Sequence, residues 1–236
     1  MKRQLSASQD RFHLTDYGVL QEPSCSETDV IVFIYSLHLR QVDRNLIRQG
    51  FGRQMSNYKL KVIFVVDRSP TRSDGFNDSM ESAEFKDMLK FNVPSYKSTA
   101  TLRHILTLKW LSSNCEHLKA VIPHPSEVTK ASAAFLSRFV RSWFSQFNSH
   151  ANTIYCEKIT HGVNLTAIGL TRPGTHDMCK KDTFFVMSVP VVKELLKVSN
   201  KVKYFPDDYV FVSLILRYKA DVDITQIGKC DCSIFV

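Results

Sequence analysis

Residues 29–36 read Asp-Val-Ile-Val-Phe-Ile-Tyr-Ser, and residues 60–66 read Leu-Lys-Val-Ile-Phe-Val-Val. Each is a short, nearly continuous apolar run, which is typical of a strand covered on both faces of a parallel sheet. We therefore expect Val30–Tyr35 and Leu60–Val66 to be neighbouring strands in the interior of one sheet.

Helical patterns alternate with apolar strand patterns along the rest of the chain. Residues 41–51 and 96–114 are expected to be helices, the second because Leu102, Ile105, Leu106 and Trp110 form one stripe. This alternation predicts an α/β fold, a single domain at residues 29–236 with a central, mostly parallel sheet flanked by helices. Other expected elements are helices at 80–91, 129–147 and 189–198, strands at 118–122, 152–160, 163–168 and 183–187, loops at 67–79 and 171–181, and a disordered or loosely packed arm at 1–28.

The composition narrows the class of partner. The net charge of +8 and sequence pI near 9.2 suit nucleic acid, a membrane surface or an anionic ligand such as a nucleotide diphosphate. Basic residues are scattered without a Lys/Arg block, so a nucleic-acid partner is not expected. No apolar stretch approaches the roughly 20 residues that span a bilayer, and the first 29 residues carry no signal-peptide core. Taken as it stands, the chain is expected to be cytosolic, or else a fragment or truncated gene model.

The six cysteines, at positions 25, 115, 156, 179, 230 and 232, do not identify a disulfide scaffold in a chain of this size. Free, partly buried thiols are the simplest expectation, and pairing of some cysteines is expected if the protein enters a secretory compartment.

Two adjacent acids, Asp207 and Asp208, interrupt an otherwise apolar segment near the C-terminus. Pro206 suits the first turn of a helix, so both acids are expected at a helix start. A carboxylate at the edge of an apolar core can have a raised pKa and act as a general base. Acids in a first turn also stabilise the helix dipole, by about 0.3–1 kcal/mol, with no chemistry involved. From this segment alone, the structural role is the simpler interpretation.

Four stretches resemble the β-1,3-galactosyltransferase-like hexosyltransferases, a family with a GT-A fold. Residues 44–52, Arg-Asn-Leu-Ile-Arg-Gln-Gly-Phe-Gly, resemble the family's R-x-x-I-R-x-T-W-G, and residues 62–66 resemble its F-L-L-G strand. The block from Glu84 to Cys115 resembles the stretch that ends in L-x-W-x-x-x-x-C. Residues 184–188 and then 205–212, Phe-Pro-Asp-Asp-Tyr-Val-Phe-Val, resemble Y-V-x-S followed by E-D-V-Y-V-G.

The resemblance implies transfer of a hexose, galactose or N-acetylhexosamine, from a UDP-sugar to a glycoprotein or glycolipid acceptor with inversion. The family's base falls on Asp208, with Asp207 in the neighbouring Glu position. UDP-sugar is expected above the carboxyl ends of the strands, where open α/β sheets bind ligands. Arg44 and Arg48, one turn apart, are expected to face its phosphates, or else to lie on a solvated helix face.

The family's metal site is changed in this chain. Its run of acids, which holds Mn²⁺ against the diphosphate, falls on Pro125-Ser126-Glu127, so only Glu127 keeps a carboxylate. Glu127 could hold Mn²⁺ with His124 as a second ligand, or both could be loop residues without a metal.

Three functional hypotheses follow. The first is a hexosyltransferase of the secretory pathway, located in the Golgi by resemblance although this chain carries no signal anchor. The second is an inactive glycosyltransferase-like protein that binds sugar, nucleotide or a partner enzyme. The third is a cytosolic α/β protein of another class, for which the sequence offers neither a Walker A motif nor a dinucleotide glycine fingerprint.

Overall fold

The computed structural model describes residues 17–36, 41–52, 59–68, 72–93, 99–124, 144, 147–164, 166, 175–181 and 183–227.

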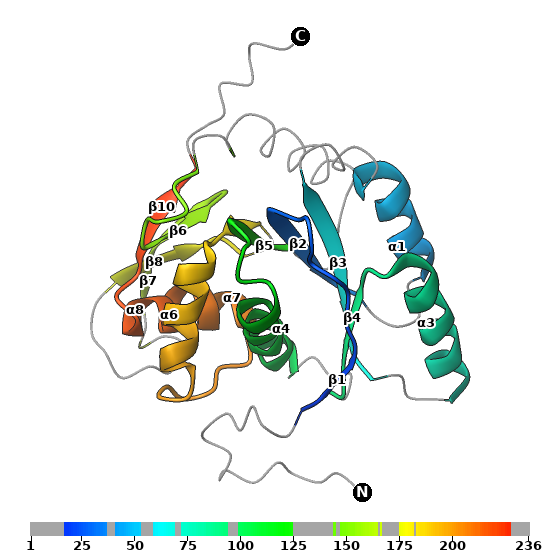
Figure 1. The fold of residues 1–236 in the computed structure, drawn as a ribbon. Coiled ribbons are helices and arrows are strands. Elements are labelled where there is room, and N and C mark those ends of the chain that lie inside the picture. The colour runs from blue at the N-terminus through cyan, green and yellow to red at the C-terminus, as the bar shows by residue number, and fades with distance from the viewer. Residues whose placement is uncertain are drawn as a thin grey trace, which may run out of the picture.

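The centre of the fold is a five-stranded sheet with the strand order β1–β4–β3–β2–β5. Strands β2 to β5 are parallel, and β1 runs antiparallel to β4. The strands are β1 Val19–Gln21, β2 Val30–Tyr35, β3 Leu60–Val66, β4 Met88–Phe91 and β5 Ala120–His124. Helices flank this mostly parallel sheet (Figure 1), which confirms the expected α/β class and is consistent with a GT-A-like domain.

The two apolar runs are neighbouring interior strands, as their sequences predicted. They pair in parallel from Val30 opposite Leu60 to Tyr35 opposite Val65. Because side chains alternate along a strand, Phe33 and Val65 lie in one core cluster with the side chains of α4 (Ala100–Asn114). The intervening residues, such as Val32 and Phe64, lie in a second cluster on the other face of the sheet.

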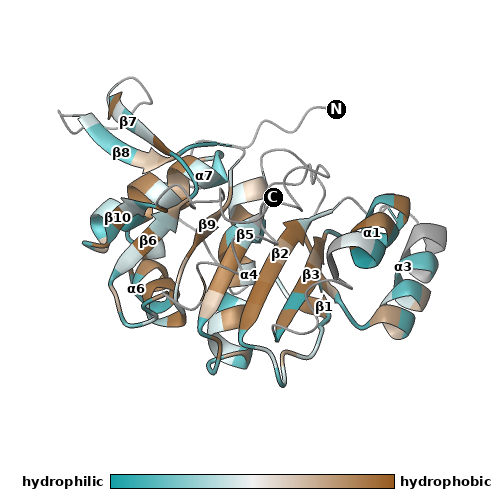
Figure 2. Cartoon of the chain, turned by 90° about the horizontal axis from the view of Figure 1, so that it is seen from above, coloured by the Kyte–Doolittle hydropathy of each residue, from teal (hydrophilic) through white to brown (hydrophobic). Residues whose placement is uncertain are grey.

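Helices cover both faces of the sheet. α1 (Gln41–Ile47), which continues into a π-helical turn at Arg48–Gly52, and α3 (Arg72–Phe85) lie on one side, and α4 lies on the other (Figures 1 and 2). Packed beside α4 are α6 (Val189–Ser199) and a C-terminal helix. That helix consists of α7 (Asp208–Val210), a π-helical segment at Phe211–Leu216 and α8 (Arg217–Lys219).

Two smaller sheets extend the structure beyond β5. One has the order β10–β6–β9, with β6 Thr153–Cys156, β9 Phe185–Val186 and β10 Asp223–Gln226. The other is a hairpin of β7 (Ile159–Asn164) and β8 (Thr175–Cys179). An antiparallel bridge between Val121 and Met187 joins the first of these sheets to β5.

The segment around residues 67–91 differs from its sequence prediction. The expected loop at 67–79 contains the start of α3, and the expected helix at 80–91 ends at Phe85 and is followed by strand β4. Asp78 and Glu81 of this helix are buried because they pair with Lys90 and Arg44. These long-range ion pairs turn charged residues inward, which local periodicity cannot predict.

Residues 17–28, expected to belong to a loosely packed arm, contribute a strand and a disulfide to the sheet region. β1 pairs with β4, and Cys25 is bonded to Cys115. Cys156 is bonded to Cys179, which lies on β8 within the expected loop at 171–181. Both Cα–Cα distances, 5.8 and 5.3 Å, fall in the usual disulfide range. The simplest expectation of free thiols is therefore wrong for these four cysteines, while positions 230 and 232 lie outside the described residues.

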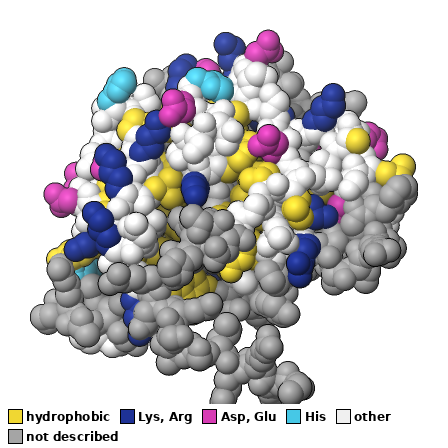
Figure 3. All heavy atoms as spheres, turned by 60° about the horizontal axis from the view of Figure 1, so that its bottom comes forward, with side chains coloured by type: hydrophobic (Ala, Val, Ile, Leu, Met, Phe, Trp, Pro, Cys, Tyr) yellow, Lys and Arg dark blue, Asp and Glu magenta, His cyan; other side chains and the backbone are white. Residues whose placement is uncertain are grey.

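The described surface carries mixed charge. On the face shown in Figure 3, lysine and arginine side chains lie among acidic ones, with apolar side chains between them. Across the described ranges, no helix combines the length and apolarity needed to cross a membrane. The helix expected at 129–147 falls almost entirely outside those ranges.

Candidate active site

The acid pair begins the C-terminal helix, as predicted, and its first member has a structural role. Asp207 is the N-cap of α7: its Oδ1 accepts a hydrogen bond of 3.1 Å from the backbone N–H of Val210. Its Oδ2 is paired with Nζ of Lys181 at 3.0 Å. An N-cap of this kind satisfies a backbone donor that the helix itself leaves without a partner.

Asp208 makes a different contact, with the buried helix α4. Its Oδ2 lies 3.1 Å from Nδ1 of His104, a residue with no exposed side-chain surface. The Asp208 side chain is itself 17% exposed, so solvent still reaches it. The two adjacent acids therefore differ in role: one caps the helix, and the other forms a dyad with a histidine.

The dyad sits at the carboxyl edge of the central sheet. Tyr35 is the last residue of β2, and its ring centroid lies 5.8 Å from that of His104. Asp67 directly follows β3 and accepts a 2.8 Å hydrogen bond from Arg103, the neighbour of His104 on α4. The Arg103 guanidinium in turn lies 5.6 Å from the Tyr35 ring centroid. This is the edge at which open α/β sheets bind their ligands.

The surroundings of Asp208 keep its carboxylate ionised. Burial by itself raises the pKa of Asp208, but the hydrogen bond and charge of His104, its own backbone N–H and the charge of Arg103 outweigh burial and hold the pKa below its usual value. A raised pKa, which the sequence offered as one possibility for this carboxylate, is not found. Burial, with the charge of Asp208, raises the pKa of Tyr35 well above its usual value, so that phenol keeps its proton. A carboxylate that is ionised at neutral pH and part-exposed is available to accept a proton.

Arg44 and Arg48 lie elsewhere, between α1 and α3. Arg44 is 1% exposed and donates two hydrogen bonds to Glu81, and Arg48 contacts both Glu81 and Asp87. The Arg48 guanidinium also lies 4.0 Å from the ring centroid of Phe85. The alternative of a solvated helix face is wrong, because protein carboxylates account for both positive charges. A contact between these arginines and nucleotide phosphates stays a prediction.

Of the two candidate metal ligands, the structure describes the backbone of His124 but not Glu127. His124 ends β5, where its backbone is opposite Ile34 of β2, so it belongs to the same sheet edge as Tyr35. Glu127 lies outside the described residues. Within the described part of the chain, no group of three or more His, Cys, Asp and Glu side chains could hold a metal ion. A Mn²⁺ site formed by His124 and Glu127 therefore stays a prediction.

Comparison with protein families matches residues 42–228, well over half of the chain, to the Galactosyltransferase family. The chain belongs to this family. Membership supports a glycosyltransferase activity for this domain, and it excludes the alternative of an α/β protein of another class. A search of curated proteins finds no match.

Three residues of this galactosyltransferase-family site were missed by the sequence analysis: Tyr35, Arg103 and His104. A signal for His104 existed in the sequence. Thr101, His104 and Thr107 recur at intervals of three along α4, and all three are fully buried. Polar side chains on the buried face of a helix indicate that this face meets other polar groups. The partner of His104, Asp208, is 104 residues away, so the sequence does not reveal it.

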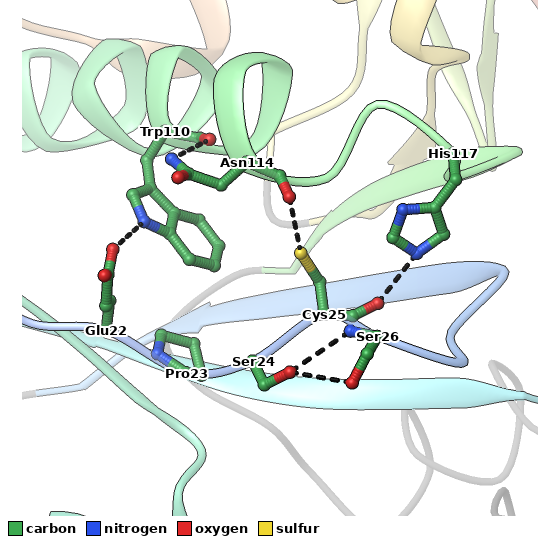
Figure 4. A pocket seen from close by; sticks show the side chains of 8 residues that line it. All are labelled: Glu22, Pro23, Ser24, Cys25, Ser26, Trp110, Asn114 and His117. Carbon is green, nitrogen blue, oxygen red and sulfur yellow. Dashed lines mark hydrogen bonds between the residues drawn. The ribbon is translucent and has the colours of Figure 1, made fainter.

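The galactosyltransferase-family domain also has an open pocket of about 490 Å³ that is separate from the dyad. It lies between the segment before β2 and the end of α4, and the Trp110 indole N–H donates a 2.9 Å hydrogen bond to Glu22 there (Figure 4). Its lining includes Cys25 and His117 but neither Asp208 nor His104. His104 belongs to the opposite end of α4, so this pocket is not the candidate active site.

Proposed function

We propose that this protein is a hexosyltransferase that moves a hexose from a UDP-sugar to an acceptor hydroxyl with inversion, and that Asp208 is the general base. The observation that carries the proposal is the Asp208 carboxylate itself. It is ionised, part-exposed and in hydrogen-bonding contact with His104 at the carboxyl edge of the sheet, in a chain of the Galactosyltransferase family.

The proposed step is one in-line displacement. The acceptor oxygen forms a bond to the anomeric carbon while the bond from that carbon to UDP breaks, and the hydroxyl proton passes to Asp208. A carboxylate of low pKa suffices, because the hydroxyl becomes strongly acidic only as its oxygen bonds to carbon. The requirement is that the carboxylate is in its ionised form, and its low pKa provides this.

The donor is proposed to bind above the same edge, with its hexose within reach of Asp208. Mn²⁺, when bound by Glu127 and His124, would stabilise the negative charge on the departing diphosphate. The described residues do not supply a complete ligand set for such an ion, and the base step does not depend on one.

The disulfides support an extracytoplasmic location. Disulfides persist in secretory compartments and are rare in the cytosol, and the described residues include the disulfides Cys25–Cys115 and Cys156–Cys179. Together with the family, this favours the Golgi lumen and glycoprotein or glycolipid acceptors.

An inactive glycosyltransferase-like binding protein is the second candidate. One observation favours it: the position of the family's acid run keeps a single carboxylate, Glu127. Such a protein would still bind sugar or nucleotide at this edge but would not catalyse transfer.

The experiment that separates the two candidates measures UDP binding and UDP release with the purified protein. Binding of UDP should depend strongly on Mn²⁺, and one of UDP-galactose, UDP-N-acetylglucosamine and UDP-N-acetylgalactosamine should release UDP when a mixture of glycan acceptors is added. Metal-independent UDP binding without release from any donor supports the binding protein instead.

A further inference from the structure

The contact between His104 and Asp208 is short, and its histidine is held inside the protein. His104 Nδ1 lies 3.1 Å from Asp208 Oδ2, and the histidine is completely buried. Among the described residues, His104 is the only one whose side chain hydrogen-bonds the Asp208 carboxylate, which also accepts from its own backbone N–H. A carboxylate accepts but does not donate, so Nδ1 must carry a proton.

We propose that His104 is a positioning residue for the base: its Nδ1–H holds one oxygen of Asp208 so that the other is presented to the acceptor hydroxyl. This inference rests on the proposed function and deepens it. His104 is fully buried behind the carboxylate, so it acts through Asp208 and not on the substrate.

The imidazole is held in place by packing as well as by its hydrogen bond. The Phe33 ring meets it edge-on with centroids 5.3 Å apart, and the Phe185 ring lies nearly parallel at 6.1 Å. These rings belong to β2 and β9, so the central sheet and a smaller sheet both fix the orientation of the histidine. A rigid donor transmits its orientation to the group that it holds.

Within the described residues, the other charged and titratable side chains near Asp208 do not hydrogen-bond to its carboxylate. Arg103, also on α4, donates to Asp67, and Lys181 pairs with Asp207. Tyr35 from β2 and Tyr204 from the segment before α7 both have raised pKa values, because burial and the charge of Asp208 disfavour the phenolate. Arg103 Nε and the Tyr35 hydroxyl are buried without a hydrogen-bond partner in the described ranges. Although these donors belong to residues near Asp208, the side chain that hydrogen-bonds its carboxylate in the described part of the chain is that of His104.

The two ring nitrogens of His104 give the proposal a specific test. Nε2 is buried and has no hydrogen-bond partner in the described ranges. The side-chain amide of asparagine reaches the place of Nδ1, and that of glutamine reaches the place of Nε2. His104→Asn should therefore keep a donor for Asp208, whereas His104→Gln should lose it while retaining a polar side chain.

The experiment compares the wild-type protein with His104→Asn, His104→Gln and the control Ser112→Ala. Ser112 lies on the same helix, where its hydroxyl donates to the carbonyl of Lys109. NMR titration of the Asp208 carboxyl should give a higher pKa in His104→Gln, and a pKa near that of the wild type in His104→Asn and Ser112→Ala. In the pH profile of kcat/KM, the acid limb should move to higher pH in His104→Gln only, and kcat should fall on the order of 10²-fold, the loss expected for a misplaced catalytic group.

The NMR result does not depend on turnover, so the two proposals fail separately. A wild-type protein that releases no UDP contradicts the proposed function, while the titration still decides whether His104 acts on Asp208. An unchanged Asp208 pKa in His104→Gln, or equal shifts in the glutamine and asparagine variants, would refute the positioning role. If the variants do not fold, ¹⁵N NMR of the wild type decides: a proton on Nδ1 supports the proposal, and a bare Nδ1 with the proton on Nε2 refutes it.

Discussion

Replacing Glu81 with glutamine should destabilise the protein strongly, because this buried carboxylate pairs with the buried Arg44 and the partly buried Arg48. It accepts hydrogen bonds from both Arg44 and Arg48, and its side chain is 2% exposed. Breaking a buried ion pair by removing one partner costs about 3–5 kcal/mol. The upper part of that range is expected here, since the new amide N–H₂ would face guanidinium donors. For a chain of this size, the loss corresponds to a fall in Tm of roughly 6–20 °C.

Urea unfolding of Glu81→Gln beside the wild type measures this loss, with Asp29→Asn as the control. Asp29 pairs with Lys119 at the surface, where both side chains are substantially exposed, so that change should cost less than about 1 kcal/mol. A loss below 1 kcal/mol for Glu81→Gln would show that the arginines do not rely on this carboxylate and would favour their predicted contact with nucleotide phosphates.

The stability difference between wild type and Glu81→Gln should depend on pH. Burial raises the pKa of Glu81, but the hydrogen bonds and charges of Arg44 and Arg48 outweigh burial and hold it below its usual value. The folded protein thus binds this proton less readily than the unfolded chain does, so the stabilisation is complete above the unfolded pKa of about 4.3 and is lost as pH falls through the folded pKa. The stability gap between wild type and Glu81→Gln should narrow below about pH 4. A gap that widens there would contradict the ion-pair assignment.

The remaining predictions concern the helix cap and a disulfide. Asp207→Ala should cost about 0.5–2 kcal/mol of stability in thermal unfolding, because it removes the N-cap of α7, and it should leave turnover within a few-fold of wild type. A collapse of turnover with unchanged stability would show that Asp207, and not Asp208, is the base. Replacing Cys156 and Cys179 together with serine should cost about 3 kcal/mol, since their disulfide closes a segment with a sequence separation of 23; equal stability of the variant and wild type in unfolding assays without reductant would contradict this pairing.

The sequence predicted the interior of the fold better than its edges. β2 and β3 are apolar along nearly their whole length, so their place in the sheet follows from composition alone. β4 also has buried residues throughout, but it contains Lys90, and the helical pattern before it concealed the strand. The charge of Lys90 is accommodated by the buried Asp78, a contact that depends on tertiary structure. β8 and β10 are short and carry exposed residues, so neither shows a clear strand pattern.

The sequence placed the two acids of the candidate site at a helix start but did not reveal the contacts that each of them makes. The apolar segment around Asp207 and Asp208 was sufficient to place both acids at a helix start. Which of them caps the helix and which lies against another helix depends on Lys181 and His104, distant residues that the fold brings to them. The direction of the Asp208 pKa shift follows from the same contacts, and local sequence suggested the opposite direction.

Turnover of a UDP-hexose by Asp208→Asn, compared with Asp207→Asn and wild type, tests the central claim most directly. An asparagine at 208 can still accept the hydrogen bond from His104, so the fold should be kept, while the general base is lost. We expect kcat to fall about 10²–10⁴-fold in Asp208→Asn with little change in Tm, and to stay within a few-fold of wild type in Asp207→Asn. Equal turnover by wild type and Asp208→Asn would show that Asp208 is a structural acid and that the base lies elsewhere.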